Sequence, residues 1–160
     1  MKQKIVLDAA PIIFAAKTGL GPLLPKLGFE FLATPLIKRE VLAGDFPEKP
    51  IIEKMFSKLI KTKPPLRQVR SKWLHEGEES AISLAREEKA RLISDDKAAV
   101  IEAKSIGVEC GYSSFLVFAA LKKKIIDKRE AKNIFRQMTE AGWWCDAATL
   151  ARIFDLLDEA

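Results

Sequence analysis

Short apolar segments alternate with longer amphipathic segments along most of this chain, and this alternation restricts its fold more than any other feature. The candidate strands are Ile5–Leu7, Phe29–Leu32, Arg91–Ser94 and Val108–Cys110, with Leu66–Val69 as a candidate edge strand. Helical periodicity predicts helices over residues 11–16, 34–43, 51–60, 78–89, 97–105, 113–122, 127–138 and 146–157. Strands separated by helices of about ten residues favour crossover connections and parallel pairing. The pattern therefore predicts an α/β fold, a three-layer α/β/α sandwich with a mostly parallel central sheet.

The chain has the size and composition of one domain. It has 160 residues, of which 48% are hydrophobic and 31% charged, a balance typical of globular proteins. We find no internal repeat and expect a single domain over residues 1–160, with the helices from about residue 127 packing on it. Lys and Arg total 27 against 22 Asp and Glu. The net charge of +5 permits a polyanionic partner without requiring one.

Three features favour a cytoplasmic location without a membrane partner. No apolar run reaches the ~18 residues that a membrane span needs. The first residues lead directly into an apolar strand-like run, and no signal-peptide pattern precedes it. The two cysteines, Cys110 and Cys145, are too few for a disulfide framework, which indicates a reducing compartment.

Acidic residues directly follow two of the predicted strands. Asp8 follows Ile5–Leu7, and Asp95 and Asp96 follow Ser94 at the end of another strand. Ligand sites of parallel sheets lie at the carboxyl ends of the strands. Pro11 near the helix start places the helix cap at residue 10, which leaves Asp8 available for another role. We therefore expect these acids to face a common site, unless they serve only as turn residues or helix caps.

Two of the predicted helices carry further carboxylates. Glu40 lies on the same stripe as the apolar residues 36 and 37, and Glu78 lies on the stripe of residues 81, 82 and 85. Both are expected to point inward, although first-turn acids such as Glu78 are also favoured by the helix dipole alone. Glu79 shares a face with Ser83 and Arg86 and is predicted to lean toward solvent.

Carboxylates that converge in one pocket repel each other unless a cation lies among them. Oxygen ligands without Cys or His select a hard divalent ion, Mg²⁺ or Mn²⁺. Such an ion can activate a water for phosphodiester hydrolysis and stabilise the charge of the leaving oxygen. The acid pattern thus predicts metal-assisted hydrolysis.

Other noticeable residues have simpler interpretations. Asp127 and Asp146 are predicted helix caps, and the only histidine, His75, is expected at the surface. Trp143 and Trp144 are adjacent and cannot both be buried on one face, and core packing or a partner interface is favoured for them over base stacking. Two basic runs are solvated faces by default and would guide a phosphate backbone if the acids hold metal. They comprise Lys61, Lys63, Arg67, Arg70 and Lys72, and Lys122, Lys123, Lys124, Lys128, Arg129, Lys132 and Arg136.

Four ordered segments resemble the PIN-domain family. They are Ile5–Asp8, Pro35–Val41, Gly77–Ile82 and Leu92–Ala98, and the turn at Gly142–Trp144 with the last helix is also similar. The likeness spans most of the chain and is greatest to the compact prokaryotic branch related to toxin ribonucleases of the VapBC type. No single motif is specific, and the ordered set carries the resemblance.

The resemblance implies a PIN fold and an Mg²⁺- or Mn²⁺-dependent endoribonuclease site. The catalytic and metal-binding acids of the family fall on Asp8, Glu40, Glu78 and the Asp95–Asp96 pair. Adjacent residues of an extended segment point opposite ways, and alignment favours Asp96 as the ligand, with Asp95 as a ligand or supporting partner. The chain departs from the family at residue 10, an alanine where related proteins often have Ser or Thr that could orient the carboxylate or a water.

The sequence therefore predicts a metal-dependent ribonuclease that acts on single-stranded or loop RNA. The resemblance also implies a toxin neutralised by an antitoxin protein, and a homodimer. Two alternatives remain open at this stage. One is a catalytically inactive PIN-like interaction module, and the other is a structure-specific DNA nuclease.

Overall fold

The structure is a computed structural model and describes residues 1–159. The strands are β1 (Lys4–Leu7), β2 (Glu30–Ala33), β3 (Ile60–Thr62), β4 (Arg91–Ile93) and β5 (Cys110–Gly111). The helices are α1 (Ala9–Lys17), the 3₁₀ helix η1 (Gly21–Leu27), α2 (Pro35–Leu42), α3 (Lys49–Lys58), α4 (Glu76–Glu88), α5 (Lys97–Ser105), α6 (Ser114–Lys122), α7 (Lys128–Glu140) and α8 (Ala147–Glu159).

The five strands form one sheet in the order β3-β2-β1-β4-β5, and every neighbouring pair is parallel. In the central strand β1, Ile5 lies opposite Phe31 of β2 and Arg91 of β4. The predicted α/β class with a parallel sheet is confirmed. The strand order reverses direction between β1 and β4, and this reversal is where ligands bind in open parallel sheets.

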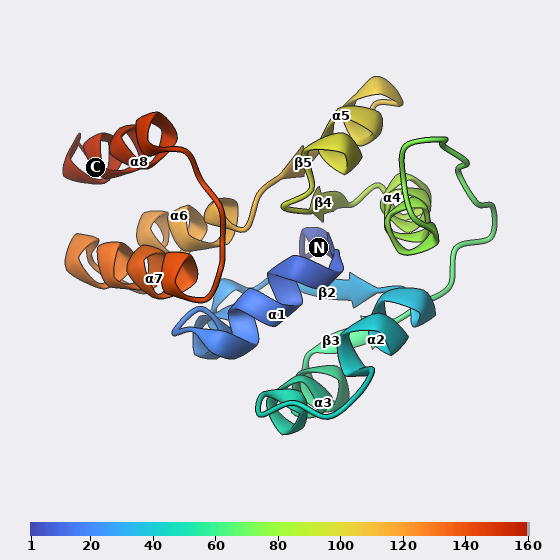
Figure 1. The fold of residues 1–160 in the computed structure, drawn as a ribbon, viewed down its shortest axis with the longest axis horizontal. Coiled ribbons are helices and arrows are strands. Elements are labelled where there is room, and N and C mark those ends of the chain that lie inside the picture. Colours follow the sequence, from blue (N-terminus) through green and yellow to red (C-terminus); the bar gives the residue numbers. More distant parts are fainter. Residues whose placement is uncertain (160) are drawn as a thin grey trace.

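The central strand explains why this sequence folds as a covered sheet. Ile5, Val6 and Leu7 are at most 1% exposed, because β1 is buried on both faces and has no solvent side to alternate with. Helix α2 packs on α3 and also contacts α4. Helix α4 packs on β1, β4 and α5, while α1 packs on α2, α3 and α7 (Figure 1).

The last three helices form a lobe beside the sheet, on the left of Figure 1. Helix α7 contacts α1 and α6, and α8 contacts α7. Phe135 of α7 and Leu157 of α8 are fully buried and belong to the same apolar cluster as the residues of β1. The lobe therefore shares one core with the sheet.

The third strand lies earlier in the chain than predicted. Residues 60–62 form β3 and pair with β2, so that Ile60 lies opposite Phe31, and α3 ends at Lys58 instead of continuing to Ile60. The prediction of an edge strand over Leu66–Val69 is wrong. Periodicity extended the helix too far because the apolar residues 59 and 60 continue its spacing, although they leave the helix to enter the sheet.

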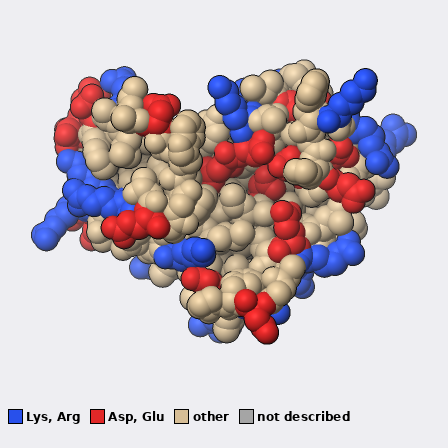
Figure 2. Space-filling model, viewed as in Figure 1, with Lys and Arg blue, Asp and Glu red and all other residues tan. Residues whose placement is uncertain are grey.

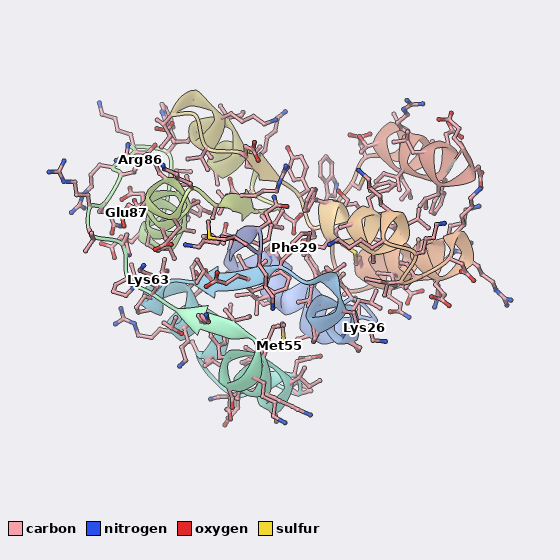
Figure 3. All side chains as sticks on the ribbon, turned by 180° about the vertical axis from the view of Figure 1, so that it is seen from behind. Lys26, Phe29, Met55, Lys63, Arg86 and Glu87 are labelled. Atoms are coloured by element: carbon pink, nitrogen blue, oxygen red, sulfur yellow. The ribbon has the colours of Figure 1, made fainter. Side chains whose placement is uncertain are left out.

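The segment of residues 63–75 connects β3 to α4 and is held by side chains of that helix. Glu79, Ser83 and Glu87 are spaced four residues apart and therefore lie on one face of α4. The backbone N–H groups of residues 71 and 69 donate to Glu79 Oε1 at 3.2 Å and to Ser83 Oγ at 2.7 Å, and those of residues 66 and 67 donate to Glu87 at 2.9 and 2.8 Å. Figure 3 shows this connection passing beside α4, with Lys63 and Glu87 labelled.

This arrangement overturns the predicted position of Glu79. Its side chain is 5% exposed and faces the 63–75 segment, so the expectation that it leans toward solvent is wrong. The face it shares with Ser83 is covered by the segment, which no periodicity within α4 can reveal.

Among residues 1–159, no helix is both long and apolar enough to cross a membrane.

Candidate functional site

An acid-lined cavity of about 390 Å³ lies at the carboxyl ends of the central strands. It adjoins the reversal of strand order between β1 and β4. Figure 2 shows acidic side chains gathered in the middle of this face, with many of the Lys and Arg side chains toward its rim. We call this space the acid cavity, and its lining residues are Asp8, Ala9, Ala10, Phe14, Glu40, His75, Glu78, Asp95, Asp96, Gly142, Trp143 and Trp144. All five acids predicted from the sequence line it.

Asp8 is the most buried of these acids, at 6% exposure. It caps α1, which begins at Ala9, so the expectation that residue 10 would be the cap is wrong. Its Oδ1 accepts from the Ala9 N–H at 2.9 Å, and its Oδ2 accepts from the Ser94 hydroxyl at 2.8 Å. Burial raises the pKa of Asp8 against these two hydrogen bonds, and the negative charges of Glu40 and Asp96 raise it further.

The two adjacent aspartates after β4 have different roles. Asp95 accepts at Oδ1 from the Ser113 N–H at 2.9 Å and from Trp143 Nε1 at 3.2 Å, and at Oδ2 from the Ser113 hydroxyl at 2.5 Å. Asp96 is exposed and caps α5, with Oδ1 accepting from the Ala99 N–H at 2.9 Å. Asp95 therefore ties β4 to the start of α6 and to Trp143, while Asp96 keeps its other oxygen available.

Glu78 lies at the start of α4, where it accepts a hydrogen bond from the His75 N–H at 3.1 Å. Burial raises the pKa of Glu78 to about 7 against the hydrogen bond from His75, and the negative charges of Asp96 and Asp8 raise it further. The side chain of Glu78 is therefore close enough to Asp8 and Asp96 for their charges to affect its ionisation.

Glu40 reaches the cavity from an exposed position on α2, so the expected inward orientation holds only for the end of its side chain. It comes close to the backbone at Gly77, where a methyl group would lie 3.0 Å from Glu40 Oε2 and 3.3 Å from Ile37 Cδ1. Gly77 therefore allows Glu40 and Glu78 to share the cavity.

Three neighbours of the acids were not predicted as site residues from the sequence. Ser94 is fully buried, and its hydroxyl donates to Asp8 while accepting from the Asp96 N–H at 3.2 Å. Trp143 and Trp144 line the cavity with opposite exposures, 7% and 82%. The position of Ser94 directly before the acid pair is its only local signal, and nothing in the sequence indicates that it faces Asp8.

The cavity gathers several carboxylates, but they do not yet have the geometry of a metal site. Within residues 1–159, no three or more His, Cys, Asp and Glu side chains are already arranged to hold a metal ion. The donor set nevertheless consists of carboxylate oxygens. Burial, and to a lesser degree the charges of neighbouring carboxylates, raises the pKa values of Asp8 and Glu78, and a cation would offset this penalty on their charged forms. The residues therefore suit a hard divalent ion in chemistry, while their side chains would have to move to bind it.

The fold and the cavity define an α/β domain whose parallel sheet gathers carboxylates at the carboxyl ends of its strands. A family model described as "DUF3368: PIN domain" matches residues 4–159. The chain therefore belongs to the PIN-domain family. PIN domains are generally nucleases and typically depend on a divalent metal, so the chain has a nuclease-type fold.

Comparison with solved structures supports the same fold. The structure is similar to a PilT N-terminus domain protein, SSO1118, from the hyperthermophilic archaeon Sulfolobus solfataricus P2. The two share 20% sequence identity with a TM-score of 0.51, over 74% of this chain and 94% of the other. Comparison with curated proteins found no match.

Proposed function

We propose that this protein is an Mg²⁺- or Mn²⁺-dependent endoribonuclease that hydrolyses phosphodiester bonds of single-stranded or loop RNA. The observation that carries the proposal is the convergence of Asp8, Glu40, Glu78, Asp95 and Asp96 on one cavity from four separate parts of the chain. Like charges are brought together here at the expense of stability, which is typical of a site that binds a cation.

The ion would be held by the carboxylates of Asp8, Glu40, Glu78 and Asp96. Asp95 would not bind the ion and would instead hold the neighbouring backbone in place. When bound, a divalent ion supplies an activated water and neutralises charge on the leaving oxygen. Asp95 accepts hydrogen bonds from Ser113 and Trp143 and thereby fixes the backbone next to Asp96. The exposed side chain of Glu40 is free to turn toward the ion, whereas Asp96 is held by its hydrogen bond from the Ala99 N–H.

Ser94 supplies the hydroxyl that related proteins often carry at residue 10. The side chain of residue 10 is a methyl group here, but the Ser94 hydroxyl donates to Asp8 Oδ2 from the end of β4. A hydrogen bond of this kind orients a ligating carboxylate and favours its charged form. The alanine is therefore compatible with an active site.

The 63–75 segment provides the positive charge that an RNA backbone needs near a negative cavity. Arg67, Arg70 and Lys72 are exposed on it, and none of them forms an ion pair with another residue in the part of the chain from 1 to 159. The segment ends at His75, which lines the cavity. Such a track attracts phosphates without reading sequence.

The proposal is tested with a single-stranded RNA and a DNA of the same sequence, each in Mg²⁺, Mn²⁺ or EDTA. We expect cleavage of RNA that depends on the metal. The substitution Asp8→Asn should lower cleavage at least about 100-fold, because even the outer partners of metal ligands contribute about 10–100-fold. Asp127→Asn is the matched control, since Asp127 caps α7 with the same Asp chemistry outside the cavity, and this variant should cleave like the wild type.

Each alternative has its own result. Undiminished cleavage by Asp8→Asn contradicts the assignment of the site. Preferred cleavage of DNA indicates the DNA nuclease, and no binding of Mn²⁺ at millimolar concentration indicates the inactive interaction module. The toxin role, the antitoxin partner, the homodimer and the cytoplasmic location rest on the family resemblance and composition, and they stay predictions.

A further inference from the structure

Trp143 and Trp144 are neighbours in the chain with opposite surroundings. Trp143 is 7% exposed, packs with its ring 5.9 Å from that of Phe135, and donates its indole N–H to Asp95. Trp144 is 82% exposed. The turn before them depends on Gly142, whose φ of +102° is in the region that favours glycine, and on the Trp143 N–H, which donates to the carbonyl of residue 138 at 2.9 Å. Anchoring of Trp143 therefore directs Trp144 outward.

Trp144 separates the acid cavity from a second one. The second cavity has a volume of about 320 Å³ and shares Asp95, Trp143 and Trp144 with the acid cavity. Its other lining residues are Lys97, Tyr112, Ser114, Cys145, Asp146, Thr149 and Ile153. A ligand held at the acids can thus extend across Trp144 into the second cavity.

The lining of the second cavity suits a nucleobase. Trp144 and Tyr112 present exposed aromatic rings, and aromatic rings stack on bases of any sequence. The hydroxyl of Ser114 offers a hydrogen-bond partner for a base edge, and Lys97 offers a cation for a neighbouring phosphate. The remaining carboxylate, Asp146, already accepts two hydrogen bonds from Thr149. The Thr149 N–H donates to Oδ1 at 2.7 Å and the Thr149 hydroxyl donates to Oδ2 at 3.0 Å.

We propose that Trp144 and Tyr112 form a stacking subsite for the base of a nucleotide next to the phosphate held at the acid cavity. The subsite rests on the proposed nuclease function and would bind a base of the single-stranded or loop RNA proposed as its substrate. Bases inside a duplex are stacked and paired and cannot enter such a pocket, whereas the bases of single strands and loops can. The expected substrate is therefore a strand with unstacked bases.

The test measures binding of a fluorescently labelled single-stranded RNA by anisotropy, with Ca²⁺ present to neutralise the acids and with RNA integrity checked by gel. Trp144→Ala should weaken binding about tenfold, within the range of about 5- to 150-fold that corresponds to stacking of one base. Trp144→Phe should restore most of the affinity, because it keeps an aromatic face. Mn²⁺ affinity, measured by calorimetry, should be unchanged in both variants.

Ile101→Ala is the control, because Ile101 is a large apolar side chain of α5 with 58% exposure that lines neither cavity and lies outside the 63–75 segment. It should change RNA affinity less than twofold. A set of RNAs with one abasic residue each gives a second measurement. When the missing base is the one that stacks on Trp144, the abasic RNA should bind the wild type as weakly as intact RNA binds Trp144→Ala. The same abasic RNA should bind Trp144→Ala no more weakly than that.

Equal RNA binding by wild type and Trp144→Ala overturns the subsite, as does an equal loss in Ile101→Ala. Independent effects at every abasic position would overturn it as well. A polypeptide partner would then be the better occupant of this surface. The outcome is separable from that of the nuclease proposal. Trp144-dependent binding without cleavage contradicts only the nuclease activity, whereas cleavage with Trp144-independent binding contradicts only the subsite.

Discussion

The strand-end acids and the helix-borne acids of the cavity are held in different ways. Asp8, Asp95 and Asp96 follow strands of the sheet, and the backbone or neighbouring side chains donate hydrogen bonds to each of them. Glu40 and Glu78 come from helices, where Glu78 accepts one hydrogen bond from the start of α4 and Glu40 reaches in from an exposed face.

The difference indicates how the site would adapt to an ion. Strand-end acids are preorganised by the sheet, and their positions cannot change without loss of hydrogen bonds. The helix-borne side chains have more conformational freedom and can close on the ion from the other side. We therefore expect substitutions on the strand side to affect stability or metal affinity strongly, and those on the helix side to affect activity with little effect on folding.

The largest expected effect is on stability, from Asp95→Ala. The change leaves three donors of Ser113 and Trp143 without an acceptor, at about 1–3 kcal/mol for each one that stays buried. A total of about 3 kcal/mol lowers Tm by about 6–12 °C in a domain of this size. Asp96→Ala removes only a helix cap and should lower Tm by about 2–4 °C, since such a cap contributes about 1 kcal/mol.

Thermal unfolding followed by circular dichroism measures both variants. A larger loss of Tm in Asp96→Ala than in Asp95→Ala would contradict the division of roles between these two residues. Cleavage should show the reverse order, with the greater loss in Asp96→Ala when both are compared below their Tm.

The next effect is on metal affinity, from Ser94→Ala. Without the hydroxyl, Asp8 Oδ2 and the Asp96 N–H both lose their partner, so two acids lose their orientation together. We expect Mn²⁺ to bind about 10–100-fold more weakly in calorimetric titration, the usual effect of removing an outer partner of a ligand. Ser83→Ala is the control, because Ser83 is equally buried and holds the 63–75 segment outside the cavity. If Ser94→Ala and Ser83→Ala bind Mn²⁺ with the same affinity, Ser94 does not orient the metal ligands.

The sequence predicted the strand side of the site better than its surroundings. A continuous apolar run followed directly by an acid identified β1 and Asp8, because burial on both faces and the end of a parallel strand are local consequences of the pattern. The relation between Asp8 and Ser94 joins residues 86 positions apart. It depends on the pairing of β1 with β4, which no local pattern contains.

The helix side shows the limit of periodicity. It identified α4 and the inward stripe of Glu78, but it placed Glu79 in solvent because the 63–75 segment that covers this residue has no regular pattern of its own. The prediction for the two tryptophans was limited in the same way. Adjacency indicated that only one could be buried on a given face, and the choice of Trp143 depends on Asp95, 48 residues away in the chain.

A smaller effect is expected on the helix side, from Gly77→Ala. The new methyl group would lie 3.0 Å from Glu40 Oε2, and the flexible Glu40 side chain should turn away from the cavity. Cleavage should fall about tenfold, at the lower end of the 10–100-fold range, because the displaced Glu40 can still return to the ion. Stability should change by less than about 1 kcal/mol, because the preference of a helix for alanine over glycine is opposed by the tight contact of the new methyl group with buried Ile37. Steady-state cleavage and urea unfolding of the same preparation measure the two effects. If the cleavage rate and the free energy of unfolding fall together, Gly77 is needed for packing and not for the position of Glu40.

The smallest effect is the pH dependence of stability without metal. The pKa of Glu78 is about 7 in the folded protein, above the ordinary value of 4.5. The folded state therefore holds an additional proton between these values, and the free energy of unfolding should fall as the pH rises from about 4.5 through about 7. The change should stay below about 1 kcal/mol, because the side chain is only half-buried and solvent screens its neighbours.

Urea unfolding in EDTA at pH 5.5 and pH 8 measures this change. Glu78→Gln should lose less stability than the wild type between the two pH values, and the remaining loss belongs to Asp8, whose raised pKa acts in the same direction. Mn²⁺ needs the ionised carboxylates, so its binding at pH 7 should release protons from the wild type and fewer from Glu78→Gln. Calorimetry in two buffers of different ionisation enthalpy counts them. Equal proton release in both proteins would place Glu78 outside the metal site and leave the strand-end acids to bind the ion without the helix side.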